Sequence, residues 1–301
     1  MTIRLSENFR ALFYAPFYAA HAIGAYEAEG VDVELVSSAD PARTAAALHS
    51  GEIDVMWGGP LRVMLTHARD PAADSVCFCD VIARDPFFIV GREPHPGFQV
   101  ADLADVRFAS VSEVPTPWLC LQDDVRQAGV DPETLDRVSG PTMAENAASL
   151  RTGGLDAVQL FQPHAEELIA SGDGHIWYAA ADRGLTAYTT LVTRRGLLAS
   201  RRDELLRMTR AMARVLRWIA ATPGDDIARA VAAFFPEVPH GIFAAAMDRY
   251  RALALYAPDP MLRREGFDRL QAAMRSGGAL DRAIPFEVCV DNSVAEQALG
   301  Q

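Results

Sequence analysis

The chain has 301 residues, half of them hydrophobic, and its 40 acidic residues outnumber its 28 basic residues to give a formal net charge of -12. This composition supplies a core for one large domain or two ordinary ones and excludes long disorder. An acidic chain without a basic stripe argues against a nucleic-acid partner. Every basic residue is an arginine. The absence of lysine excludes a lysine-bound pyridoxal phosphate and a Walker A loop.

The N-terminal stretch Met1–Asn8 lacks the charged and then apolar pattern of a secretory signal. The sequence also contains no run of about 18 apolar residues. On these patterns we expect a cytoplasmic protein, unless a signal segment has been trimmed. The four cysteines do not indicate a disulfide framework, because only Cys77 and Cys79 are close in sequence and one intervening residue is poor geometry for a bridge.

The first part of the chain predicts strands and helices in alternation. The expected order is a strand at residues 3–5, a helix at Pro16–Glu29, a strand at Val31–Val36, a helix from Asp40 to His49, a strand at Glu52–Trp57 and a helix after Pro60. Short joints between these elements indicate right-handed βαβ units on a parallel sheet.

The middle of the chain begins with two apolar runs, Val76–Ile82 and Phe87–Val90. Beyond them, the Pro/Gly-rich stretch Glu93–Gly97 is expected to cross to a second lobe. The alternation then resumes, with strands expected at Val106–Val111 and Leu155–Leu160 and helices at Pro117–Ala128 and from Thr142 to Arg151, the last of these opened by a capping box.

One short sequence pattern occurs in both halves of the chain. Leu48–Val55 and Leu150–Ala157 each read as a helix end, a glycine and a buried strand. A strand at Ala187–Thr193 is expected to return the chain to the first lobe. After it we expect helices at 203–221, 225–235, 240–254 and 260–276, and a late strand at Phe286–Val290. We therefore predict an α/β protein with lobe I at residues 1–90 and 188–301 and lobe II at residues 91–187, each a doubly wound, mainly parallel sheet.

Several motifs resemble a known family. They lie at Ala15–Ala20, Gly24–Val36, Ala45–His49, Ser50–Trp57 and Asp102–Asp105. Together they resemble the type II periplasmic solute-binding fold and, within it, the nitrate, sulfonate and taurine group of NMT1/THI5-like proteins, over roughly residues 1–220. The resemblance implies a monomer that binds a small molecule between two lobes. It also implies delivery to an ABC transporter permease, in the periplasm if a signal segment is removed.

One branch of this family, the yeast pyrimidine synthase, uses lysine-bound pyridoxal phosphate and a cysteine-rich motif. That activity is not carried over, because this chain has no lysine and its Cys77 and Cys79 lie in a different region from that motif. We expect no cofactor and no metal, since no second cysteine pair or spaced histidines accompany these two cysteines.

In open α/β sheets a ligand lies beyond the carboxyl ends of the strands, where helix N-termini converge and favour anions. We expect aromatic side chains there to hold a flat ligand, arginines to pair with an anionic group, and polar side chains to orient a heterocycle. The predicted ligand-binding residues are Asn8, Phe9, Arg10, Tyr14, Ser38, Trp57, Gly58, Gly59, Arg62, Asp80, Arg84, Ser112, Thr116, Gln159, Phe161, Gln162, His164 and Tyr188. The alternative for each is a structural role in the core or on the surface.

The main hypothesis is a solute-binding protein, not an enzyme, that closes two lobes over a small anionic or flat heterocyclic ligand of the sulfonate, carboxylate or pyrimidine type. The alternative is a cytoplasmic enzyme on the same scaffold, with a desulfinase- or lyase-like activity. It would use Cys77 or Cys79 as nucleophile, together with an arginine and His164. A buried free thiol that only fills space is the simpler interpretation of both cysteines.

Overall fold

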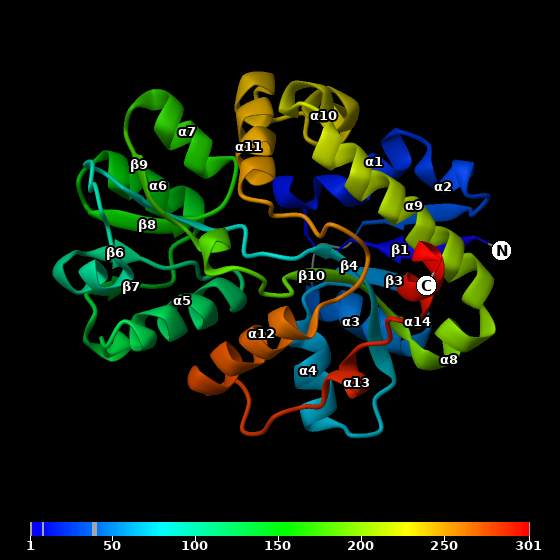
Figure 1. The fold of residues 1–301 in the computed structure, drawn as a ribbon. Coiled ribbons are helices and arrows are strands. Elements are labelled where there is room, and N and C mark those ends of the chain that lie inside the picture. Colours follow the sequence, from blue (N-terminus) through cyan, green and yellow to red (C-terminus); the bar gives the residue numbers. More distant parts are fainter. Residues whose placement is uncertain (1, 8, 38–40, 301) are drawn as a thin grey trace.

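The computed structural model describes residues 2–7, 9–37 and 41–300. Their strands form two separate five-stranded sheets, each flanked by helices, and the chain crosses from one sheet to the other and back (Figure 1). We call the first sheet with its helices lobe I and the second sheet with its helices lobe II. This is the two-lobed α/β architecture that the sequence predicts.

The sheet of lobe I has the order β2-β1-β3-β10-β4. Its strands are β1 (Ile3–Ser6), β2 (Val33–Val36), β3 (Val55–Gly58), β4 (Ser75–Ile82) and β10 (Thr189–Arg194). β1 runs parallel to β2 and β3, whereas β10 runs antiparallel to β3 and β4. β10 confirms that the chain returns to the first sheet near the predicted strand.

The sheet of lobe II has the order β7-β6-β8-β5-β9. Its strands are β5 (Phe88–Gly91), β6 (Phe108–Ala109), β7 (Arg137–Val138), β8 (Ala157–Leu160) and β9 (His175–Ala179). β6 is parallel to its neighbours, whereas β5 is antiparallel to β8 and β9. In each sheet the strand after the crossing, β10 or β5, runs against its neighbours, and the other four strands share one direction. Each sheet is therefore mixed but mainly parallel, as the sequence predicts.

The crossings between the lobes are short. The chain passes from β4 to β5 through Ala83–Phe87 and returns from β9 to β10 through Ala180–Tyr188. The expected crossing at Glu93–Gly97 is wrong, because this stretch follows β5 in lobe II, where the Trp177 indole donates to the Glu93 carbonyl at 2.7 Å. Strand pairing also places residues 88–90, which were predicted with lobe I, in the second sheet.

The helices of lobe I before the first crossing are α1 (Ala15–Ala22), α2 (Ala25–Ala28), α3 (Pro41–Ser50) and α4 (Pro60–Arg69), with a 3-10 turn at Leu12–Tyr14 ahead of α1. The single helix expected over Pro16–Glu29 is divided in two. Gly24 separates α1 from α2 with a φ of +66°, a left-handed conformation that glycine adopts without steric cost.

The helices of lobe II are α5 (Thr116–Gln127), α6 (Met143–Arg151) and α7 (His164–Ser171), with 3-10 turns at Val100–Asp105, Pro132–Thr134 and Ala180–Arg183. The predicted capping box before α6 is confirmed. The Thr142 amide donates to the Glu145 carboxylate at 2.7 Å, and the Glu145 amide donates to the Thr142 hydroxyl at 3.2 Å. Both bonds satisfy backbone amides that a helix start leaves without partners.

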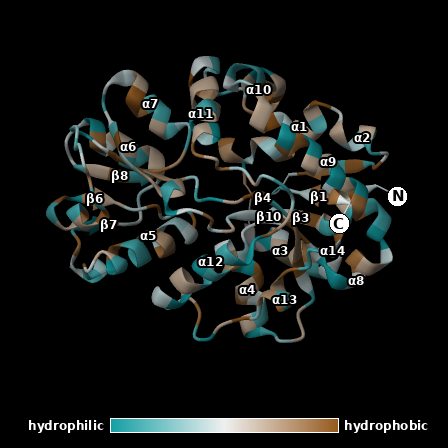
Figure 2. Ribbon diagram, in the orientation of Figure 1, coloured by the Kyte–Doolittle hydropathy of each residue, from teal (hydrophilic) through white to brown (hydrophobic). Residues whose placement is uncertain are grey.

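The chain ends in helices that pack on both lobes. They are α8 (Arg195–Ser200), α9 (Arg202–Ala221), α10 (Gly224–Val231), α11 (His240–Ala252), α12 (Arg264–Ser276), α13 (Phe286–Cys289) and α14 (Ser293–Leu299), with a 3-10 turn at Ala232–Phe234. Hydrophobic and hydrophilic residues alternate along α9, which buries one side of the helix (Figure 2). α11 packs against α7 and α12 against α5, so these two helices reach lobe II.

The late strand expected at Phe286–Val290 is wrong. Pro285 precedes a short helix there, and only Val290 makes a bridge to the sheet, beside Cys77 of β4. Within the described ranges, none of the helices is long and apolar enough to cross a membrane.

A buried ion cluster ties the two crossings together. Arg183 of the second crossing donates to Asp85 of the first at 2.8 Å and, through its Nε atom, to Asp124 of α5 at 2.9 Å. The Arg183 and Asp85 side chains are 6% and 0% exposed. Burial raises the pKa of Asp85, and the Arg183 guanidinium opposes that rise.

Candidate ligand-binding cleft

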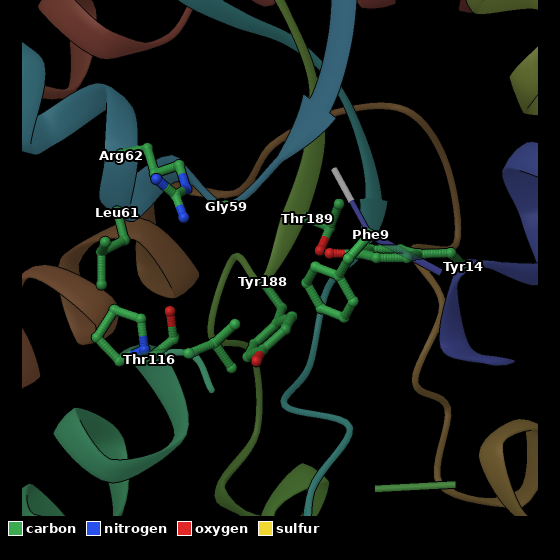
Figure 3. Close-up of a pocket in the computed structure, with 10 residues that line it drawn as sticks. Phe9, Tyr14, Gly59, Leu61, Arg62, Thr116, Tyr188 and Thr189 are labelled. Carbon is green, nitrogen blue, oxygen red and sulfur yellow. The ribbon is translucent and has the colours of Figure 1, made fainter. Parts of the chain in front are cut away.

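A narrow cavity lies where the two lobes face each other. Residues from both lobes form its walls: Phe9, Tyr14, Gly59, Leu61, Arg62, Val114, Pro115, Thr116, Tyr188 and Thr189 (Figure 3). Six of them, Phe9, Tyr14, Gly59, Arg62, Thr116 and Tyr188, were predicted from the sequence. We refer to this cavity as the cleft.

Two helix starts face the cleft from opposite lobes. α4 follows Gly59 in lobe I, and α5 follows Pro115 in lobe II, and neither preceding residue caps its helix with a side-chain hydrogen bond. Pro60 and Pro117 in the first turns carry no amide hydrogen, and the Arg62 amide donates to the Gly59 carbonyl at 3.0 Å. The helix dipole, more than free amides, therefore places partial positive charge there. The cleft is therefore suited to a negatively charged group.

Arg62 adds a full positive charge to this wall. Its side chain is half-buried, and in the described ranges it has no hydrogen-bond or ion-pair partner. Figure 3 shows its guanidinium turned toward the space between α4 and Thr116. A guanidinium can bind a carboxylate or sulfonate through two parallel N–H bonds, so Arg62 is available to hold such a group.

Gly59 allows the two strands of the cleft wall to approach closely. A Cβ atom at this position would lie 3.2 Å from the Tyr188 carbonyl oxygen, tighter than ordinary van der Waals contact. Gly59 was predicted to let the backbone approach a ligand, and the close neighbour found here is the backbone of Tyr188. Gly58 ends β3 and lies outside the cleft lining.

Aromatic rings form the opposite wall and bring the lobes into contact. Phe9 packs on Tyr14 with ring centroids 5.2 Å apart, and Phe13 lies 5.9 Å from Tyr188. Phe161 of lobe II reaches into this group, stacking on Phe9 at 6.5 Å and meeting Phe13 at 5.3 Å. Burial raises the pKa of Tyr188, so its hydroxyl stays protonated and neutral at physiological pH.

The cleft has a volume of about 40 Å³, which is room for little more than a water molecule. Phe161 of lobe II contacts Phe9 and Phe13 of lobe I, so ring contacts join the two lobes beside this cavity. An organic ligand therefore needs the lobes to separate or these rings to rotate.

The chain matches the model of the NMT1-like family over residues 9–234. It belongs to the NMT1-like family. A relative from Bacillus subtilis (strain 168), YtlA, is named as a binding protein; it is 25% identical over 301 residues, covering 99% of this chain and 90% of YtlA.

Solved structures share the fold of this NMT1-like protein. The periplasmic aliphatic sulphonate binding protein SsuA from Escherichia coli matches with a TM-score of 0.77, 16% identity and coverage of 100% of this chain and 99% of SsuA. The desulfurization enzyme DSZB matches with a TM-score of 0.70, 15% identity and coverage of 99% of both chains. At these identities the matches establish the periplasmic binding protein fold, which both a binding protein and an enzyme adopt.

Cys77 and Cys79, the residues of the enzyme hypothesis, lie in β4 away from the cleft lining. Both are fully buried, and burial raises the pKa of each thiol. A thiol in this state is a poor nucleophile because it does not ionise near neutral pH. The geometry of this NMT1-like chain therefore favours the interpretation of both thiols as core residues.

Trp57 was predicted to line the cleft, and the structure places it in the core of lobe I instead. It is fully buried and stacks on Phe17 of α1, with ring centroids 4.6 Å apart and planes 9° apart. Trp57 does lie near the carboxyl end of β3, at the edge of the sheet where the ligand was expected. Its side chain, however, points to the face that α1 covers.

Gln159 and Gln162 were predicted to orient a ligand, and both are instead bound to the protein. Gln159 accepts from the Val111 amide at 3.3 Å and donates to the Pro117 carbonyl at 3.0 Å, which fixes the loop before α5. Gln162 accepts from the Glu166 amide at 2.9 Å and so caps the start of α7. These buried amides support the cleft wall without lining it.

His164 and Ser112 are also committed to neighbouring groups. His164 contacts the Glu167 carboxylate at 3.3 Å, one turn along α7. Ser112 is exposed and donates to the Pro141 carbonyl at 2.8 Å. Neither lines the cleft.

Arg10 and Arg84 were predicted as anion clamps, and both have partners within the protein. Arg10 contacts the Glu7 carboxylate at 3.2 Å, and Arg84 donates to the Ala181 carbonyl at 3.2 Å, from one crossing to the other. Asn8 and Ser38 lie outside the described residues.

Asp80 lies away from the cleft, under the segment that carries Asp259 and Arg263. It is 2% exposed, and its carboxylate accepts from the Val81 amide at 3.1 Å. Burial raises the pKa of Asp80 to about 8, and the nearby Asp259 adds to the rise while Arg263 opposes it. Its role is structural. Asp80 was predicted to bind ligand because it lies near the carboxyl end of its strand, β4, but that position does not place its side chain in the cleft.

The predicted ligand-binding residues did not include Leu61, Val114, Pro115 or Thr189, although Val114 and Pro115 lie in the segment 112–116 expected at the cleft. The first three are apolar residues beside helix starts, where no chemical signal separates a cleft position from a core one. Thr189 lies inside the strand predicted at Ala187–Thr193, so it was assigned to the sheet and not to the cleft. The one available signal was its position directly after Tyr188, which was predicted.

Proposed function

We propose that the protein is a solute-binding protein that captures a small organic anion between its lobes. The observation that carries this proposal is the cleft itself. Two helix starts without a side-chain cap face one space from both lobes, next to aromatic rings and to Arg62, which has no side-chain partner among the described residues. The positive groups would hold a carboxylate or sulfonate, and Phe9, Tyr14 and Tyr188 would cover a flat body. YtlA and SsuA, named as binding proteins, support this function.

We further propose that the ligand is delivered to an ABC importer, by a monomer located in the periplasm. Support comes from the family and from SsuA of Escherichia coli, which is named as a periplasmic protein. Closure would turn about the crossings at Ala83–Phe87 and Ala180–Tyr188, with lobe I at residues 1–87 and 189–301 and lobe II at residues 88–179. A ligand that binds the closed form better than the open form shifts the population toward it.

The enzyme alternative rests on DSZB, which has the same fold. In this chain it would need Cys77 or Cys79 to become exposed and ionised. Rapid alkylation of one of these thiols at neutral pH, with protection by a ligand, would favour the enzyme.

Ligand-dependent melting temperatures test the binding function. The panel contains benzenesulfonate, benzoate, short alkanesulfonates and neutral isosteres such as benzenesulfonamide and benzamide. We expect at least one anion to raise the melting temperature in proportion to the logarithm of its concentration, and its neutral isostere to have a much smaller effect. A panel in which no anion stabilises the protein, or in which neutral isosteres act equally, would overturn the proposal.

A further inference from the structure

A second cavity, which we call the side cavity, lies within lobe I. α3 and α4 form its sides, and β3, β4 and β10 contribute residues to its floor (their positions are seen in Figure 1). Its volume is about 280 Å³, against about 40 Å³ for the cleft. Apolar walls come from Ala45, Leu48, Met56 and Val63, while Arg194, Ser75 and Thr66 add polar groups.

The arginines of the side cavity differ from the others in the described part of the chain. The other arginines that have no side-chain hydrogen bond or ion pair among the described residues, such as Arg210 and Arg217, are exposed to solvent. Half-buried arginines elsewhere have partners, as Arg249 has in Glu166 and Arg126 in Ser276. Arg62 and Arg194 are the two exceptions in the described ranges, and both line the side cavity.

Two buried polar atoms at one end of this cavity lack partners. They are the Nε atom of Arg194 and the hydroxyl oxygen of Ser75. The two residues are neighbours across β10 and β4, because Arg194 pairs with Ser75 in the strand register. Leaving buried donors without acceptors is costly, and such groups are rare in folded proteins. Both atoms have almost no solvent-accessible surface, so an acceptor in the cavity can satisfy them only after the Arg194 or Ser75 side chain turns toward it.

The charges of the side cavity come from Arg194 and Asp74, a balance of +1 - 1 = 0, so an anion is favoured at the Arg194 guanidinium itself and not by the cavity wall as a whole. Figure 3 shows the Arg62 guanidinium on the cleft side, so its stem forms a wall shared by the two cavities. Arg194, in contrast, lines the side cavity and not the cleft.

We propose that the side cavity binds a small organic anion, with its carboxylate, sulfonate or phosphate group on Arg194 and Ser75 and its apolar body against Leu48, Met56 and Val63. The guanidinium and the hydroxyl supply donors in the arrangement an oxyanion accepts. A volume of about 280 Å³ suits a molecule the size of a substituted benzene ring. This site lies within lobe I and goes beyond the ligand proposed for the cleft.

The test is a calorimetric titration of the full chain with benzoate, benzenesulfonate and phenyl phosphate, and with inorganic phosphate as a probe of the head group alone. Arg194→Gln removes the cation, Ala45→Phe fills the cavity without a charge change, and Arg210→Gln is the matched control on the surface. We expect one organic probe to bind with an affinity that Arg194→Gln lowers roughly 10- to 100-fold. Ala45→Phe should lower the same binding event comparably, and Arg210→Gln should leave it within about twofold.

The location of the probe separates this proposal from the cleft. A crystal soaked in 4-bromobenzoate should show an anomalous bromine peak between α3 and α4. A peak only between the lobes would overturn the proposal that the side cavity binds an anion, and so would affinities unchanged in both Arg194→Gln and Ala45→Phe. Either result would leave the proposed function of the cleft intact. A bromine peak between α3 and α4 with none between the lobes would support the side cavity and count against the proposed function of the cleft.

Discussion

Arg183 at the crossings and Arg62 at the cleft place the same side chain in opposite circumstances. Arg183 is almost fully buried and donates to two carboxylates, Asp85 and Asp124. Arg62 is half-buried and has no partner in the part of the chain described. Arg183 therefore fixes the geometry of the crossings, whereas Arg62 keeps its donors available for a ligand.

The difference shows how the protein separates stability from binding. A charge deep in the protein is stable only when opposite charges and hydrogen bonds surround it. A charge kept without partners at a cleft contributes little to folding, and a ligand supplies the missing acceptor. The following variants test whether the two arginines divide these roles.

Of the two arginine variants, Arg183→Leu should have the larger effect on stability. It leaves Asp85 buried with no ion-pair partner, and losing one member of a buried pair costs about 3–5 kcal/mol. Urea denaturation followed by circular dichroism measures the loss in unfolding free energy. Arg210→Leu, at an exposed arginine, is the control and should change stability by less than about 0.5 kcal/mol. Equal effects of the two variants would show that the ion cluster is not structural.

Arg62→Gln should have the opposite profile, with a large effect on binding and little on stability. The lost charge-assisted bonds predict a weakening of about 1.5–3 kcal/mol for an anionic ligand. The unfolding free energy should stay within about 0.5 kcal/mol of the unaltered chain. Calorimetric titration and denaturation of the same preparation measure both. A stability loss as large as that of Arg183→Leu would remove the distinction between the two arginines.

Asp80 is a third kind of charged site, a buried carboxyl without a close cationic partner. Because burial raises its pKa to about 8 in the folded protein, the unfolded chain loses this proton at lower pH than the folded one. Its contribution to stability is therefore present below about pH 4 and is lost as the pH rises through about 8.

Asp80→Asn removes this titration while its side-chain oxygen can still accept from the Val81 amide. We expect the variant to be more stable than the unaltered chain at pH 9 by about 4–6 kcal/mol, at about 1.4 kcal/mol per pKa unit, with the difference shrinking toward pH 5. Urea denaturation at pH 5, 7 and 9 measures it. Parallel pH profiles of the two proteins would refute the elevated pKa.

Ser112→Ala should have the smallest effect. The Ser112 hydroxyl is exposed and bonded to the Pro141 carbonyl, away from the cleft. The ligand affinity of Ser112→Ala should therefore stay within about twofold of that of the unaltered chain. Thr116→Val, which changes a residue of the cleft lining, should lower the affinity by more than this. A loss of affinity in Ser112→Ala as large as in Thr116→Val would mean that the cleft extends to Ser112.

Much of the fold could be predicted because glycine, proline and apolar periodicity mark its elements. The alternation through α4 and the capping box of Thr142 are local signals, and local geometry decides them. The crossing could not be located in this way. A Pro/Gly-rich stretch such as Glu93–Gly97 forms a surface turn as readily as a linker, whereas the real crossing at Ala83–Phe87 is buried and apolar in part.

The cleft could be predicted only at the level of strand ends and helix starts. That rule finds Gly59, Arg62 and Thr116, because these residues open helices at the edge between the lobes. It fails for Trp57 and Gln162, since proximity to a strand end does not say whether a side chain faces the cleft or a covering helix. Tertiary packing decides that direction.

A crystal structure of the protein as purified, with its retained small molecule identified by native mass spectrometry, is the most direct test. We predict electron density for one ligand between the lobes, with its anionic group on Arg62 and near the start of α5. Density for the retained molecule among the C-terminal helices, with the cleft closed by Phe9 and Phe161, would contradict the account.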